Sequence, residues 1–149
     1  MSDHQQLEEG LDLQIDFKKL KRVVATKEDV LPTVVQNADT HEVLLIGYVN
    51  RRALKATLTR GIAVFWSTSR NELWVKGATS GDYLQLVDIR VNCEQNSLLY
   101  RVRPLGKGVC HTKDATGTSR SGCYYRRITP QETLAFIETP SAKDCAGAK

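Results

Sequence analysis

Short alternating and β-branched runs dominate the pattern of apolar residues in this chain. Residues 33–37 and 43–49 are two such runs, and Ala38-Asp39-Thr40-His41 between them has the composition of a hairpin turn. Similar runs predict further strands at 62–67, 73–76, 83–91, 98–102 and 124–128. The runs 83–91 and 98–102 are expected to pair around a turn at 94–96. The pattern therefore predicts a sheet built mainly from antiparallel hairpins.

Helical spacing and capping residues occur together in two places. Asn50 can cap a helix over residues 51–58, and Gly61 is suited to end it. Thr129-Pro130-Gln131-Glu132 has the form of a capping box with proline at the first helical position, which predicts a second helix through Ile137. An amphipathic run at 15–24 fits a short helix in an N-terminal appendage.

These elements predict an α+β fold: a single compact domain with an antiparallel, hairpin-rich sheet and two short helices. A chain of 149 residues with 41% hydrophobic residues is long enough for one such core and short for two. We expect an N-terminal extension at 1–29, the domain at 30–138 and a tail at 139–149. The small residues of this tail predict that it is disordered. The tail also contains Cys145.

Composition and charge limit the classes of function. No apolar run approaches the roughly 18 residues of a membrane span, and the first residues lack the basic and apolar regions of a signal peptide. We therefore expect no membrane partner and a cytoplasmic location. The net charge of +4 favours a phosphorylated small-molecule ligand and does not indicate a nucleic-acid partner.

Three cysteines stand where apolar runs meet polar turns: Cys93, Cys110 and Cys123. Because cytoplasmic thiols stay reduced, this set indicates a metal site rather than disulfides. Three thiolates leave one position of a zinc tetrahedron open, as in a catalytic site. Each cysteine taken alone fits equally well as a small buried apolar residue.

His111 directly follows Cys110, and two roles are open to it. It can be the fourth zinc ligand, or it can carry a proton beside a water whose pKa zinc lowers to about 7. Neighbouring side chains of an extended segment point in opposite directions, so both residues cannot easily reach one ion. This favours His111 as the proton carrier.

Six segments carry a specific pattern: VVQNADT at 34–40, LLIGYVN at 44–50, FWSTSR at 65–70, LWVKGATSG at 73–81, CHT at 110–112 and CYYR at 123–126. With these segments the chain, over residues 30–128, closely resembles the phosphoribosyl-AMP cyclohydrolases of histidine biosynthesis. The resemblance implies hydrolytic opening of the adenine ring of 1-(5-phosphoribosyl)-AMP at the N1–C6 bond. It also implies an intertwined homodimer with zinc bound by Cys110, Cys123 and the partner subunit's Cys93, and a proton-transfer role for His111.

The chain departs from the family pattern in two places. Where the family has three aspartates that bind magnesium, it has Asn92, Glu94 and Asn96. With one carboxylate in place of three, we expect magnesium binding to be weak or assisted by substrate. In addition, Cys110 and Cys123 stand further apart than is usual, and residues 113–119 resemble an insertion that can reshape a pocket.

Cations and hydroxyl groups suited to phosphate binding follow one another along the middle of the chain. The predicted substrate-binding residues are Trp66, Ser67, Ser69, Arg70, Lys76, Thr79, Ser80 and Gly81. At least one of Trp66 and Trp74 is expected to be a core aromatic residue instead. Two other functions stay open from the residues: a zinc hydrolase acting on another purine nucleotide, and a non-catalytic binding module stabilised by zinc.

Overall fold

The computed structural model describes residues 2–137, which fall into two compact units. The larger unit is Asp16–Tyr124, and the smaller unit combines residues 2–15 with residues 125–137. Helices and hairpins occur in both units, which confirms the predicted α+β class.

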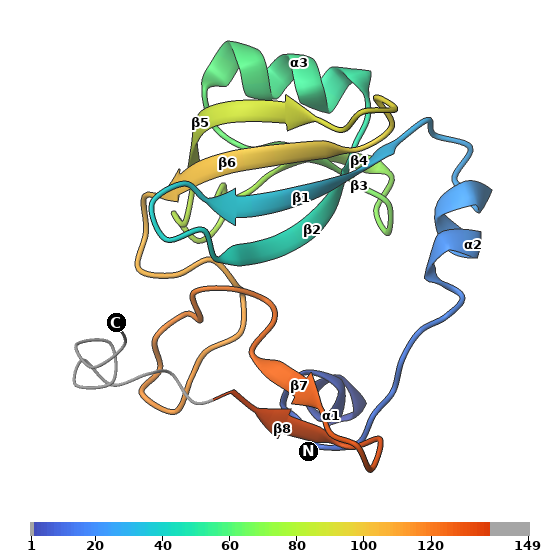
Figure 1. Cartoon of the computed structure of the whole chain (residues 1–149), viewed down its shortest axis with the longest axis vertical. Helices are drawn as coiled ribbons and strands as arrows, with labels where there is room; N and C mark the ends of the chain where they lie inside the picture. The colour runs from blue at the N-terminus through green and yellow to red at the C-terminus, as the bar shows by residue number, and fades with distance from the viewer. Residues whose placement is uncertain (1, 138–149) are drawn as a thin grey trace. The chain divides into compact units, whose positions relative to one another are not determined.

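A four-stranded sheet forms the centre of the larger unit (Figure 1). Its strands are β1 (Leu31–Asn37), β2 (Val43–Val49), β5 (Leu84–Val91) and β6 (Leu98–Pro104), in the order β2-β1-β6-β5. β1 pairs antiparallel with β2, and β5 pairs antiparallel with β6, so both predicted hairpins form. The two hairpins join through a parallel pairing of β1 with β6, which local sequence patterns did not predict.

A third hairpin, β3 (Val64–Ser67) with β4 (Glu72–Val75), continues from the edge of this sheet. The Ala63 amide donates to the Leu84 carbonyl oxygen at 2.9 Å, which ties the start of the hairpin to β5. The hairpin therefore has a fixed position relative to the sheet.

The helix α3 (Arg51–Arg60) forms as its capping residues predicted. The Asn50 side-chain oxygen accepts a hydrogen bond from the Ala53 amide at 2.8 Å, and Gly61 ends the helix in the left-handed conformation with φ 69°. The helix packs on β2, β3 and β4.

The core of the larger unit lies among these elements and is closed to solvent. Val35, Leu44, Phe65, Leu84 and Tyr100 have exposed fractions of 1% or less. These residues come from β1, β2, β3, β5 and β6, so the core joins all three hairpins into one packed body.

The helix α2 (Lys19–Ala25) occupies the region where a short amphipathic helix was expected. Val23 of this helix is buried, but within residues 2–137 Leu20 and Val24 stay 65% and 76% exposed, and Phe17 just before the helix is 90% exposed. No helix within residues 2–137 is long and apolar enough to cross a membrane.

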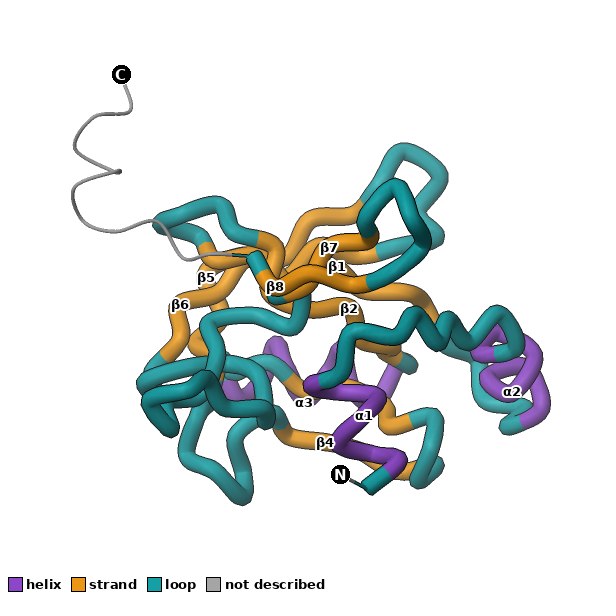
Figure 2. The backbone as a smooth tube through the Cα atoms, turned by 90° about the horizontal axis from the view of Figure 1, so that it is seen from below, coloured by secondary structure: helices purple, strands orange, loops and turns teal. Residues whose placement is uncertain are grey.

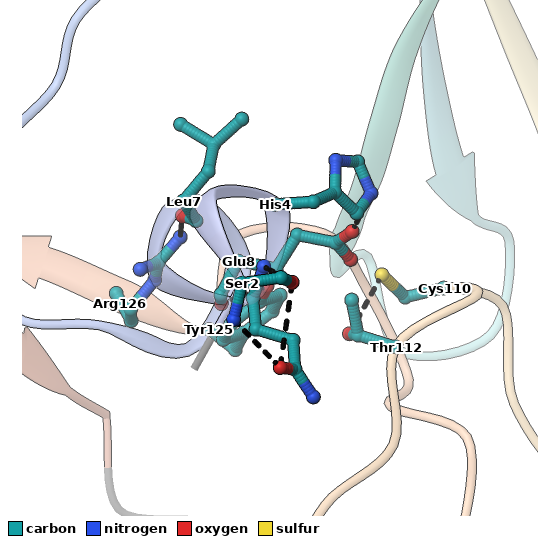
Figure 3. A network of polar contacts seen from close by, with 9 residues as sticks. Ser2, His4, Leu7, Glu8, Cys110, Thr112, Tyr125 and Arg126 are labelled. Carbon is teal, nitrogen blue, oxygen red and sulfur yellow. Dashed lines mark hydrogen bonds and ion pairs between the residues drawn. The ribbon is translucent and has the colours of Figure 1, made fainter.

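The smaller unit consists of α1 (Asp3–Glu9) and the antiparallel pair β7 (Arg126–Ile128) and β8 (Leu134–Phe136). Hydrogen bonds from β7 and the residue before it hold the helix (Figure 3). The Tyr125 hydroxyl donates to the Glu8 carbonyl oxygen at 2.7 Å, and the Arg126 guanidinium donates to that of Leu7 at 2.8 Å.

The predicted helix from Thr129 to Ile137 is wrong, because this segment is a turn followed by β8. Glu132 has φ 59°, outside the helical range, and the Thr129 amide donates to the Thr133 carbonyl oxygen. A helix of this length is marginal without tertiary packing, and strand pairing with β7 competes successfully with the capping box. The described residues instead contain three helices, of which α1 was not predicted.

Candidate active site

A long segment without helix or strand, residues 105–125, connects β6 to β7 (Figure 2). This segment carries Cys110 and Cys123. The Cys123 amide donates to the Leu44 carbonyl oxygen of β2 at 2.7 Å, and the Cys110 amide donates to that of Arg120 at 3.0 Å. These bonds place the two sulfur atoms within hydrogen-bonding range of one another. Two of the three predicted zinc ligands therefore meet within one chain.

The two thiols share a proton unequally. The Cys123 thiol, as hydrogen-bond donor, lowers the pKa of Cys110 to about 5, although the burial of Cys110 opposes this effect. The Thr112 hydroxyl, 3.1 Å from the Cys110 sulfur, acts in the same direction (Figure 3). The pKa of Cys123 is raised, chiefly because its proton is held by Cys110. The pair thus holds one thiolate, which is the form that binds metal.

Cys93 lies apart from this pair. It is exposed in the turn between β5 and β6. Within residues 2–137, its sulfur does not lie with those of Cys110 and Cys123 inside the 4.8 Å that ligands of one ion would share. A single chain therefore presents two of the three thiols at one place.

The side chains of the predicted magnesium set bond to one another. The Asn92 side-chain amide donates to the Asn96 side-chain oxygen at 2.6 Å, and the Asn96 amide group donates to the Glu94 carboxylate at 3.1 Å. The Asn92 oxygen accepts from the backbone amides of Asn96 and Ser97, both at 2.9 Å. Because these oxygens are used within the turn and two carboxylates are missing, the set does not fit a magnesium ion in this conformation.

A cavity of about 1060 Å³ opens beside Cys110 and lies within the larger unit. Two segments line it, 70–82 and 107–119. Of the predicted site residues, it is lined by Arg70, Lys76, Thr79, Ser80, Cys110 and His111. His111 is exposed, as a residue that meets substrate must be.

Other predicted substrate-binding residues do not line this cavity. Trp66 is only 7% exposed, and its indole N–H donates to the Asn71 side chain at 3.2 Å. Ser67 and Ser69 have their hydroxyl oxygens 3.4 Å apart on the hairpin, and Gly81 follows the lining residue Ser80.

Trp74 lines the cavity in place of Trp66. All four residues of β4 line the cavity together with Lys76, so the alternation of the strand carried no signal for Trp74. One of the two tryptophans is thus a core residue, as expected, and it is Trp66.

Lys76 is a buried cation, only 7% exposed, that lines the cavity. Burial lowers the pKa of Lys76, while the Asp82 carboxylate and the two cysteines oppose the shift. Gly77 follows with φ 94°, and a side chain there would collide with the Tyr83 backbone. The close return of the chain at Gly77 keeps Asp82 near Lys76.

Several lining residues were missed by sequence reasoning. They are the loop cations Lys107 and Lys113, the carboxylates Glu72 and Asp82, and the loop residues Gly117, Thr118 and Ser119. Loops lack the periodicity by which strands and helices disclose which side chains share a face. With four cations and two carboxylates, the wall favours an anionic ligand.

Comparison with known proteins identifies the family. Residues 45–125 match the family model described as phosphoribosyl-AMP cyclohydrolase. The chain belongs to the phosphoribosyl-AMP cyclohydrolase family. A phosphoribosyl-AMP cyclohydrolase of Sphingopyxis alaskensis is 43% identical over 108 residues, which are 72% of this chain and 80% of that protein. One of Thermobifida fusca is 42% identical over 107 residues, 72% of this chain and 91% of that protein.

A third relative connects the cyclohydrolase to its pathway. The histidine biosynthesis bifunctional protein of Pasteurella multocida is 39% identical over 111 residues, which are 74% of this chain and 52% of that protein. These relatives confirm the resemblance seen in the sequence. The chain is an enzyme of the cyclohydrolase type, a hydrolase of histidine biosynthesis.

The shared proton predicts a pH titration of the metal-free cyclohydrolase. In a Cys93→Ser, Cys145→Ser background, the ultraviolet absorbance of one thiolate should be present at neutral pH and lost as the pH falls through about 5. Cys123→Ala removes the donor and should move this midpoint up toward the ordinary thiol value of roughly 8.5. Identical midpoints with and without Cys123 would contradict the shared proton.

Proposed function

We propose that the enzyme opens the adenine ring of 1-(5-phosphoribosyl)-AMP by hydrolysis of the N1–C6 bond, with zinc bound by its cysteines. The observation that carries this proposal is the Cys110–Cys123 pair, which holds one thiolate at the wall of a cation-lined cavity. Membership of the cyclohydrolase family supports the same substrate. The domain responsible is taken to be residues 30–138, with residues 139–149 outside the described residues.

Zinc fits the donor set of this chain. Cys110 and Cys123 would hold it together with the partner subunit's Cys93, and thiolates are preferred ligands of zinc. When bound, zinc would supply Lewis acidity that makes water a stronger acid at neutral pH. A thiol site requires reduced cysteines, which is consistent with action in the cytoplasm.

His111 is proposed as the proton carrier. Its side chain lines the cavity directly after Cys110, so it lies where the reacting ring would meet water. His111 would take a proton from the water that adds to C6 and deliver a proton to N1 as the N1–C6 bond breaks. An imidazole is suited to both steps near neutral pH.

The remaining lining residues are proposed to bind the substrate. Arg70, Lys76, Thr79 and Ser80 offer cations and hydroxyl groups to its phosphates. The Ser67 hydroxyl accepts from the Arg70 side chain at 3.4 Å, so Ser67 would act by positioning that cation. Contacts of Trp66, Ser69 and Gly81 with substrate stay predictions.

A homodimer is proposed because no third cysteine of residues 2–137 joins the pair. Cys93 is exposed in a turn, where it is available to a second subunit. The exposed apolar residues of α2, together with Phe17 just before it, support burial against another chain. No nucleic-acid or membrane partner is proposed.

The central test is turnover of purified protein. Ring opening of phosphoribosyl-AMP, followed by absorbance, should occur with about one zinc per chain and should stop when a chelator removes the zinc. His111→Ala should lower turnover by about 10²-fold or more while zinc content is unchanged, because its proposed role is proton transfer. Loss of zinc in His111→Ala would instead make His111 a ligand, and absent turnover in zinc-loaded wild type would refute the function.

A shared zinc site predicts complementation between inactive subunits. Cys93→Ser and Cys110→Ser homodimers should each be inactive, because every site lacks one thiolate. Mixed subunits should recover part of the activity, since one of the two sites in a heterodimer then has all three cysteines. Cys145→Ser is the matched control and should retain zinc and activity. No recovery after measured subunit exchange would argue against a site built from two chains.

Magnesium is proposed to bind the free enzyme weakly and to take most of its ligands from the phosphates of the substrate. The closed turn of Asn92, Glu94 and Asn96 predicts that dialysed enzyme retains little magnesium. The double variant Asn92→Asp, Asn96→Asp removes the amide donors and adds two carboxylates, so calorimetry should detect tighter magnesium binding without substrate. Stoichiometric magnesium on dialysed wild type would contradict this expectation.

A further inference from the structure

Residues 113–119 form a small hairpin with its own internal bonds. Lys113 and Ser119 pair through an isolated bridge. The Asp114 carboxylate accepts from the backbone amides of Thr116 at 2.9 Å and Thr118 at 3.1 Å, and the Asp114 amide donates to the Thr118 carbonyl oxygen. Because its polar groups bond within the hairpin, its shape is set without a hydrophobic core.

The base of this hairpin is fixed beside the cysteine pair. The amides of Val109 and Cys110 both donate to the Arg120 carbonyl oxygen, at 2.9 and 3.0 Å. Gly108 approaches Ser119 so closely that an added Cβ would lie 2.3 Å from the Ser119 carbonyl oxygen. The hairpin therefore has little freedom at its root, and Lys113 and Ser119 line the cavity.

The charges that line the cavity are unevenly compensated. The Arg70 guanidinium lies 3.5 Å from the Glu72 carboxylate, and buried Lys76 faces Asp82. Among the described residues, no carboxylate pairs with Lys107 or Lys113. Both of these lysines line the cavity, so the excess of positive charge is located on the side formed by segment 107–119.

We propose that Lys113, together with Lys107, forms an anion subsite that binds one phosphate of the substrate. This inference rests on the proposed function for the identity of the ligand. Thr118 and Ser119 of the same hairpin also line this wall. The phosphates of the substrate are not the atoms that react, so the subsite contributes to binding and not to proton transfer.

Binding of this kind acts alike on the ground state and the transition state. Lys113→Met should therefore raise KM for phosphoribosyl-AMP about tenfold and leave kcat within about twofold. Lys113→Arg should restore most of the affinity. Lys55→Met is the matched control, because Lys55 is an exposed lysine of α3 that does not line the cavity, and it should leave KM unchanged.

Asp114→Ala separates the shape of the hairpin from its charge. Removing a carboxylate would improve anion binding if charge alone mattered, whereas loss of the internal bonds should displace Lys113 and raise KM. A KM at or below that of the wild type would overturn the role of the hairpin.

Calorimetry with zinc-loaded full-length protein tests the subsite without turnover. AMP and ribose 5-phosphate serve as probes, and the one that loses affinity in Lys113→Met identifies which phosphate is bound. If wild type binds a probe through Lys113 but does not open phosphoribosyl-AMP, the subsite stands and the proposed function fails. If wild type turns over and Lys113→Met changes neither KM nor probe affinity, the subsite is refuted while the function stands. A wild type that neither binds a probe nor turns over refutes both.

Discussion

The hydrogen bond from the Cys123 amide to the Leu44 carbonyl oxygen is the contact on which the geometry of the site depends. It ties the far end of a long loop to β2, a strand whose core residue Leu44 is 1% exposed. At the near end, the Leu105 amide donates to the Tyr83 carbonyl oxygen. Since both attachments use backbone groups, the ends of the loop are held whatever side chains lie between them.

The sheet fixes the distance and direction between these two attachment points. Leu44 belongs to β2, and Tyr83 precedes β5 at the opposite edge of the sheet. The parallel pairing of β1 with β6 joins the β1–β2 hairpin to the β5–β6 hairpin. Because a packed core holds these strands, the separation between the two ends of the loop is fixed. The thiol pair is therefore positioned by contacts between strands that are distant along the chain.

The parts of the structure that sequence reasoning recovered are those governed by neighbouring residues. Asn50 and Gly61 set the ends of α3 through local bonds, and the alternation of β5 and β6 specified their hairpin. The segment after Thr129 failed because a local capping signal competed with strand pairing to β7, which no local pattern encodes.

The residues of the candidate site also differ in whether the sequence alone could identify them. Cys110, His111 and Lys76 were selected from the sequence because the residue type alone indicates the chemistry of a thiol, an imidazole or a cation. All three line the cavity. Lys107 and Lys113 were missed because only the folded loop brings them to the cavity, and an exposed lysine in a loop carries no sign of its surroundings. Trp66 was preferred to Trp74 because residue type alone does not distinguish a buried ring from one that lines a wall.

The two walls of the cavity differ in how freely they can change during evolution. Trp74 packs against the core, with its ring centroid 5.4 Å from that of buried Phe65, so a substitution that reshaped this wall would also disturb folding. The hairpin at 113–119 makes its bonds within itself and contributes no residue to the core cluster. Mutations can accumulate there at little cost in stability, and a lineage that needed a different nucleotide specificity would acquire it most readily through that hairpin.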